Sequence, residues 1–220
     1  MSSLRCNHDD HLLFIGDSIT DAGRTNHCPP LGEGFVAMLH AELERRYSGY
    51  KIQVTNKGIC GNTIEGLNLR WDRDVLAEKP NWLFIYVGIN DAHVTLNHAG
   101  TLTNRIASFE DIYIKVIYET MVALPETKIT LITPFLLGAK PETKITQITS
   151  DYVKAVSVIA YQTALPIISL QDTFEAVMHD HPPGYWSTDG VHPTPPGHKL
   201  IAETIINHLT QLESVSCQNP

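Results

Sequence analysis

The sequence has no apolar run long enough to cross a membrane, and it has few cysteines and few basic residues. A membrane-spanning helix needs about 20 consecutive apolar residues, and no window of the chain approaches that length. Its 16 lysines and arginines are outnumbered by 24 aspartates and glutamates, which gives a formal net charge of -8. Nucleic acid and anionic membranes would repel such a chain at long range, so we expect a small or neutral partner, with no nucleic acid and no membrane.

Close cysteine pairs are also missing, because Cys6, Cys28, Cys60 and Cys217 are widely separated. This spacing indicates neither a zinc site nor a redox dithiol, so we interpret all four as reduced thiols. The 11 histidines include close pairs, but no cysteine or carboxylate spacing completes a ligand set around those pairs, and we predict no metal site. The first apolar run, 12–15, is too short for the core of a signal peptide, so we expect a cytoplasmic protein.

What the chain does contain is a regular alternation of short apolar runs with longer amphipathic stretches. That pattern is typical of strands that lead into helices in a parallel sheet. The predicted strands are 12–15, 51–55, 82–87, 128–133 and 167–170. The predicted helices are 35–47, 64–77, 106–124, 151–163 and 195–209, the last with Thr194 as its N-cap.

These elements predict a three-layer α/β/α sandwich around a five-stranded parallel sheet, flavodoxin-like, with strand order 2-1-3-4-5. We expect an N-terminal extension at 1–10, a single domain at 11–212 and a C-terminal tail at 213–220. The stretch 180–193 is the longest predicted irregular segment. Irregular segments of that length in compact domains are often functional.

Four polar blocks follow the predicted strands or precede the last helix. They read GDSITD at 16–21, NKGICGNT at 56–63, GIND at 88–91 and DGVHP at 189–193. Ligands of open parallel sheets bind at the carboxyl ends of the strands, so the predicted order brings these blocks together. The blocks resemble, in order, the motif blocks of the GDSL/SGNH hydrolase family. The resemblance implies a cofactor-free, metal-independent serine hydrolase with Ser18 as nucleophile, Gly58 and Asn90 as oxyanion donors and His192 as general base.

The chemistry of the residues agrees with these roles. A serine hydroxyl must lose its proton as it attacks, so Ser18 needs a base, and His192 is the candidate. Asp189 stands three positions before His192, close enough to hold its imidazole in one tautomer. Taken singly, Ser18 could be a turn or N-cap serine, and Asp189 could cap a helix beside a solvated His192.

The negative oxygen of a tetrahedral intermediate needs donors, and we predict the backbone N–H groups of Ser18 and Gly58 and the side-chain amide of Asn90. Singly, Gly58 could instead be a turn glycine and Asn90 an Asx-turn residue. The chain lacks the G-x-S-x-G pattern of the ordinary α/β-hydrolase elbow.

A narrower resemblance concerns the substrate. The segments FIGDSITDAGR (14–24), NKGICGNT (56–63) and RWDRDVL (70–76) are similar to intracellular acetylxylan esterases, and GIND (88–91) and ITPF (132–135) continue the match. It implies removal of acetyl groups from short xylo-oligosaccharides. The subgroup usually has serine where Cys60 stands and a bulkier sequence in place of Ala92-His93.

Asp17, Trp186 and Phe135 are the candidate substrate-binding residues; the two aromatic rings could offer an apolar surface, or belong to the core. We interpret the 70–73 segment as a helix that packs and forms ion pairs at a domain or subunit contact, and a homo-oligomer is possible. The alternative functions are a broad-specificity lipase, lysophospholipase or thioesterase, and a non-catalytic carbohydrate-binding protein.

Overall fold

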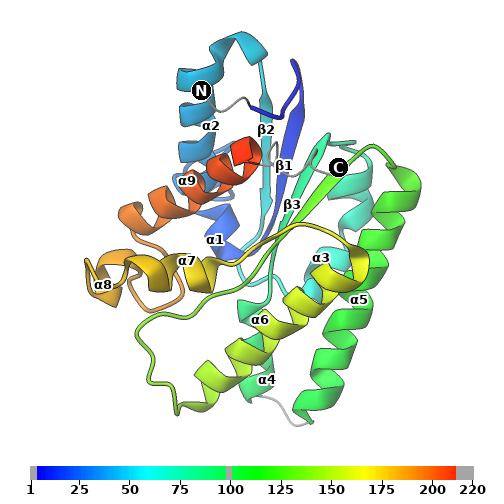
Figure 1. Ribbon diagram of the computed structural model, residues 1–220. Helices are drawn as coiled ribbons and strands as arrows, with labels where there is room; N and C mark the ends of the chain where they lie inside the picture. The colour runs from blue at the N-terminus through cyan, green and yellow to red at the C-terminus, as the bar shows by residue number, and fades with distance from the viewer. Residues whose placement is uncertain (1–3, 98–100, 212–220) are drawn as a thin grey trace, which may run out of the picture.

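A five-stranded parallel sheet forms the centre of the computed structural model, which describes residues 4–97 and 101–211 (Figure 1). Its strands are β1 (His11–Gly16), β2 (Gln53–Gly58), β3 (Trp82–Tyr86), β4 (Lys128–Ile132) and β5 (Ile167–Ile168). All neighbouring strands are parallel, and their order, β2-β1-β3-β4-β5, confirms the predicted topology. Every residue of β3 is buried, as expected for a strand that helices cover on both faces.

Helices lie on both faces of the sheet, so the predicted three layers are confirmed. In chain order they are α1 (Ser18–Asp21), α2 (Phe35–Tyr47), α3 (Ile64–Asn68), α4 (Ile89–Asn97), α5 (Leu102–Ala123), α6 (Lys144–Thr163), α7 (Leu170–Val177), α8 (Pro183–Trp186) and α9 (Pro195–Gln211), with a 3-10 turn η1 (Ser48–Tyr50) and a π-helical turn η2 (Asp72–Leu76). Figure 1 shows α2 and α9 on one side of the sheet and α5 and α6 on the other.

Alternate residues of β1 supply the two cores. Leu12 and Phe14 pack in the cluster that holds residues of α2 and α9, whereas Leu13 and Ile15 pack in the cluster that holds residues of α5 and α6. Side chains alternate across a strand, so one short apolar run fills both interfaces. The central strand is thereby fixed from both sides, and so is the chain that leaves its carboxyl end.

The helix predicted at 64–77 is divided. It is α3 followed by the π-helical turn η2. Leu69, between them, is 82% exposed, while Trp71 is 1% exposed and donates from Nε1 to Thr120 Oγ1 at 3.0 Å. The changed winding allows Trp71 and its neighbour Arg70 to be buried together, which an uninterrupted amphipathic pattern does not predict.

Other boundaries also differ from the prediction. Helices α5 and α6 begin before the predicted residues 106 and 151, and Thr101 caps α5 by accepting from Asn104 N–H. Helices α1, α4, α7 and α8 were not predicted, because each is short or begins inside a polar segment. Helix α8 lies within the stretch 180–193, which was predicted to be irregular.

The segment before β1 packs onto the sheet. Leu4 and Cys6 are buried, and Asp10 Oδ2 accepts from Trp82 Nε1 at 2.9 Å. The predicted tail, 213–220, and Cys217 lie outside the described residues, and the domain boundaries stay a prediction. Within 4–97 and 101–211, no helix is both long enough and apolar enough to cross a membrane.

Candidate active site

Ser18 is placed by the turn that joins β1 to α1. Asp17 caps α1, because its Oδ1 accepts from Ile19 N–H at 3.0 Å, and Ser18 is therefore the first residue of the helix. A buried carboxylate at a helix N-terminus satisfies an otherwise unpaired backbone donor. The alternative that Ser18 is itself the N-cap is therefore wrong, because Asp17 is the cap and the Ser18 hydroxyl faces another segment.

That other segment contains His192, 174 positions further along the chain. The Ser18 Oγ lies 3.0 Å from His192 Nε2, and His192 Nδ1 lies 2.7 Å from Asp189 Oδ2. The carboxylate accepts from Nδ1–H, which leaves Nε2 without a proton and able to accept from the serine hydroxyl. The structure brings the three residues into the order that a nucleophile, its base and the group that orients the base require.

A tight turn holds Asp189 and His192 in place. Asp189 Oδ1 accepts from the N–H groups of Val191 and His192 at 2.9 and 2.7 Å. Gly190 has a φ of 89°, and a Cβ there would come within 2.4 Å of Leu137 O, so the position requires glycine. The carboxylate thus fixes the histidine through its backbone and its ring.

The electrostatics keep this carboxylate ionised. Burial raises the pKa of Asp189, but hydrogen bonds from the His192 N–H, the His192 ring and the Val191 N–H outweigh it, so the pKa falls to about 2. The side chains of His192 and Asp189 are 51% and 52% exposed. A carboxylate in this position is able to stabilise a protonated imidazole.

The structure corrects the prediction for Gly58. Its N–H is buried and donates to Asn56 Oδ1 at 2.8 Å, so it is already bonded inside the protein. A Cβ at Gly58 would come within 2.1 Å of Asp21 N, and the glycine therefore permits close packing of β2 against α1. Asn56 Nδ2 also donates to Thr20 O at 2.6 Å, which ties the same two segments together.

Gly61, in the same loop, has the properties that were predicted for Gly58. Its φ is +77°, nothing lies within 4 Å of the position of a Cβ, and its N–H has no protein acceptor among the described residues. Asn90 Nδ2 donates to the carbonyl of the next residue, Asn62, at 3.1 Å, so the Asn90 amide lies against this loop. Sequence reasoning missed Gly61, because two glycines in one loop cannot be distinguished without their backbone conformations.

A pocket of about 420 Å³ contains Ser18 and His192. Its wall includes His198, whose Nδ1 accepts from Phe35 N–H at 3.1 Å. Burial lowers the pKa of His198 to about 4, so at neutral pH this imidazole is uncharged. Because Nδ1 accepts, the proton of His198 is on Nε2, and the ring is a neutral donor in the pocket wall.

The three candidate substrate-binding residues differ in how much of each is exposed. Asp17 is 0% exposed, and burial raises its pKa to about 7 despite the Ile19 N–H bond. Phe135 is also 0% exposed and packs against Phe174 with ring centroids 4.5 Å apart. The prediction that Phe135 offers a surface to the substrate is therefore wrong, and Asp17 acts on the site as a helix cap. Only Trp186, half-buried against the same core, keeps exposed surface.

Arg70 holds together three segments that lead into the candidate site. Its guanidinium donates to Gly16 O at 3.2 Å, Lys57 O at 2.8 Å and Asn62 Oδ1 at 2.8 Å, and it pairs with Asp74 at 2.8 Å. One buried cation thus joins the ends of β1 and β2 to the Gly61–Asn62 loop. Arg70 and Arg73 both form ion pairs with Asp74 within this chain, and a subunit contact of the 70–73 segment stays a prediction.

Comparisons with known proteins agree with this geometry. The sequence model of a family described as the GDSL-like lipase/acylhydrolase family matches residues 14–200. An acetylxylan esterase of Geobacillus stearothermophilus is 33% identical over 208 residues, which cover 91% of this chain and 94% of the relative.

Solved structures resemble the whole fold. The acetylxylan esterase of Geobacillus stearothermophilus superposes with a TM-score of 0.82 at 31% identity, covering 94% of this chain and 96% of that one. A GDSL-like protein of Parabacteroides merdae superposes with a TM-score of 0.84 at 30% identity, covering 94% and 98%. In the Geobacillus enzyme, variants described as catalytic mutants replace a serine, an aspartate and a histidine with alanine, the last two three positions apart.

Proposed function

Because the chain belongs to the GDSL-like lipase/acylhydrolase family and is a carboxylic ester hydrolase, we propose that it removes acetyl groups from carbohydrate esters through an acyl-enzyme on Ser18. The observation that carries the proposal is the contact of Ser18 Oγ with His192 Nε2 at 3.0 Å, with Asp189 on the far nitrogen at 2.7 Å. The Asp-x-x-His spacing of this pair equals that of the catalytic mutants of the Geobacillus enzyme.

In the first half of the reaction, Ser18 Oγ attacks the acetyl carbonyl carbon while His192 Nε2 takes the hydroxyl proton. The resulting tetrahedral intermediate collapses, the ester C–O bond breaks, and the sugar alcohol leaves with the proton from His192. In the second half, His192 takes a proton from water, the hydroxide attacks the acetyl-serine, and acetate leaves as Ser18 is reprotonated. Asp189 keeps the imidazole in the required tautomer throughout.

The negative oxygen of each intermediate is stabilised by the N–H groups of Ser18 and Gly61 and by the amide of Asn90. The Gly61 and Ser18 N–H groups have no protein acceptor among the described residues, and one Asn90 N–H remains for the substrate after the bond to Asn62 O. Each such donor contributes about 3 to 4 kcal/mol to transition-state stabilisation. This set replaces Gly58 by Gly61.

The carbohydrate substrate is proposed from the acetylxylan esterase relative. A pocket of about 420 Å³ is large enough for a small ester and part of a sugar. Cys60 and the Ala92-His93 pair depart from the pattern of intracellular acetylxylan esterases. The identity of the sugar that carries the acetyl group must therefore be determined with a substrate panel. The cytoplasmic location and a homo-oligomer stay predictions.

The proposal is tested with the Ser18→Ala variant and a substrate panel of acetylated xylo-oligosaccharides, other sugar acetates and longer acyl esters. We expect Ser18→Ala to lose hydrolysis of p-nitrophenyl acetate while its far-UV circular dichroism is unchanged, and an organophosphonate probe to label the wild type at Ser18 only. An unchanged rate in the variant would refute the mechanism. Equal or faster turnover of octanoyl esters would instead refute the acetyl specificity and favour a lipase.

A further inference from the structure

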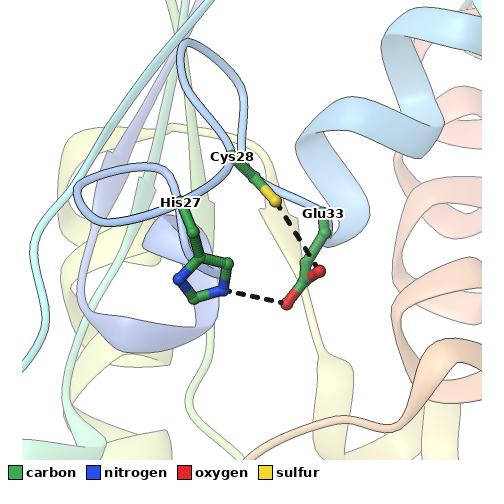
Figure 2. A group of neighbouring side chains, drawn as sticks. All are labelled: His27, Cys28 and Glu33. Carbon is green, nitrogen blue, oxygen red and sulfur yellow. Dashed lines mark hydrogen bonds and ion pairs between the residues drawn. The ribbon is translucent and has the colours of Figure 1, made fainter.

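Three side chains of the loop between α1 and α2 converge on one point (Figure 2). His27 Nε2 lies 3.6 Å from Glu33 Oε1, and Cys28 Sγ lies 3.7 Å from Glu33 Oε2. The nitrogen, the sulfur and a carboxylate oxygen all lie within 4.8 Å of one another. Among the described residues, this is the one group of at least three histidine, cysteine or acidic side chains that lie close enough to hold a metal ion together.

The backbone of the loop holds these residues in position. The N–H groups of His27 and Cys28 both donate to Gly23 O, at 3.0 and 2.9 Å. The Glu33 N–H donates to Ala22 O at 2.8 Å, which brings the far end of the loop back to the same place. The main chain is therefore fixed, while the exposed side chains of His27 and Glu33 are free to rotate toward a shared ion.

We propose that His27, Cys28 and Glu33 form a binding site for a zinc-like divalent cation. Imidazole nitrogen, thiolate sulfur and carboxylate oxygen are the usual protein ligands of Zn²⁺, and three of them with water in the fourth position form an open tetrahedral site. Ligand atoms around tetrahedral zinc lie about 3.4 to 3.6 Å apart, given the usual metal–ligand bond lengths. The histidine nitrogen lies 3.6 Å from one oxygen of Glu33 and the cysteine sulfur 3.7 Å from the other, so a rotation of the carboxylate would bring one oxygen toward both ligands.

Binding would exchange a proton for the metal. Without a cation, the Cys28 thiol donates its S–H to Glu33 Oε2. The cation takes the place of that proton, which is released to solvent as the thiolate forms. No change of oxidation state is involved.

The site lies at the wall of the active-site pocket. His27 and Glu33 line the same pocket as Ser18 and His192. A divalent cation that joins His27 and the Cys28 thiolate to Glu33 would fix this wall and neutralise its negative charge. The inference does not depend on which ester the enzyme hydrolyses, because binding is measured directly.

The sequence alone did not indicate this site. The ligands are an adjacent His-Cys pair and a glutamate five positions after the cysteine, which is not a recognised spacing. Only the return of the loop to Ala22 brings Glu33 to the other two.

The test is titration of the purified full chain with Zn²⁺ in competition with a chromogenic chelator, and with Co²⁺ followed by absorption. We expect one equivalent of tight Zn²⁺ binding and a thiolate-to-cobalt charge-transfer band. Cys28→Ser should abolish the band and weaken Zn²⁺ binding by at least about tenfold, since it removes the softest ligand. Cys60→Ser is the matched control. Cys60 Sγ also contacts a carboxylate, Asp21 Oδ2 at 3.0 Å, but among the described residues no histidine lies close enough to complete a metal-binding group with them.

A second pair of variants tests the histidine. His27→Gln should weaken Zn²⁺ binding, whereas His179→Gln, which alters an exposed histidine 3.2 Å from the Asp180 carboxylate, should leave it unchanged. Equal affinity in Cys28→Ser and the wild type would overturn the proposal. So would loss of the cobalt band in Cys60→Ser alone, or an effect of His179→Gln as large as that of His27→Gln.

Discussion

The two sides of the contact between Ser18 and His192 are built differently. On the nucleophile side, the residues around Ser18 are buried: Asp17 and Asp21 are 0% exposed and Asn56 is 3% exposed. On the base side, His192 and Asp189 are 51% and 52% exposed. Contacts between distant segments, such as Asn56 to Thr20 O, hold the first side. On the second side most bonds lie within a single turn, which the Leu137 N–H joins by donating to Gly190 O at 2.9 Å.

Because of this difference, substitutions on the two sides should affect different properties, folding stability on one side and activity on the other. Asn56 donates to Thr20 O and Leu31 O, so its loss would loosen packing between β2 and the α1 region. The bonds from the His192 N–H and ring to Asp189 span three positions, and those that His192 O accepts from Ser187 and Thr188 span at most five. We therefore expect changes on the nucleophile side to lower stability, and changes on the base side to lower activity with the fold intact.

The largest effect should come from His192→Ala. Removing the base should lower kcat for p-nitrophenyl acetate by about 10⁴- to 10⁶-fold, because Ser18 then has no acceptor for its proton. The free energy of unfolding in urea should change by less than about 1 kcal/mol, since the ring is half-exposed. A fall of several kcal/mol would show that the base side is part of the folded core after all.

The next largest effect is on stability and compares two arginines that share one partner. Arg70→Ala should lower the free energy of unfolding by about 3 to 5 kcal/mol, because it leaves Asp74 and buried carbonyls without their donor. Arg73→Ala is the control, with a cost below about 1 kcal/mol, since the side chain of Arg73 is 73% exposed against 8% for Arg70. Urea unfolding of both variants measures the difference, and equal costs would contradict the contrast.

The two sides should also respond oppositely to pH. Burial raises the pKa of Asp91, beside the nucleophile side, to about 7, although Ile64 N–H donates to it. The folded state therefore holds a proton that the unfolded state loses near pH 4, and stability falls as pH rises from about 4 to about 7. The slope is at most about 1.4 kcal/mol per pH unit for this group.

Asp91→Asn should reduce the slope by this contribution, because the amide does not titrate and its oxygen can still accept from Ile64 N–H. The slope that remains belongs to Asp17, whose pKa burial also raises to about 7. On the base side the pKa of Asp189 is lowered to about 2, so its small contribution is present above about pH 4 and lost as pH falls toward 2. Unfolding curves between about pH 2 and pH 8 for the wild type and Asp91→Asn measure both effects. An unchanged slope in Asp91→Asn would mean that Asp91 is ionised in the folded protein.

The sheet could be predicted from the sequence because its information is local. Apolar runs such as 82–87 are short, rich in Ile, Leu and Phe, and separated by amphipathic stretches, and right-handed crossovers then restrict the order of the strands. The division of the 64–77 helix could not be predicted, since it depends on Arg70 reaching Gly16 O, a contact between segments 54 positions apart.

The sequence indicated which polar blocks form the candidate site, but it did not indicate which residue within each block faces the site. Ser18, Asp189 and His192 were proposed from the chemistry of their side chains and lie in contact. Gly58 and Gly61 differ only in backbone conformation and in what surrounds them, which residue type does not encode. Phe135 was misplaced for a similar reason, because an aromatic ring after a strand can face the substrate or the core.

The central claim is that Ser18 and His192 act as one unit, and a double-mutant cycle tests it most directly. We would measure kcat/KM for p-nitrophenyl acetate in Ser18→Ala, in His192→Ala and in the double variant. The account predicts that the double variant is no slower than the slower single variant, because either change already removes the proton transfer. Independent, multiplicative losses in the double variant would contradict it.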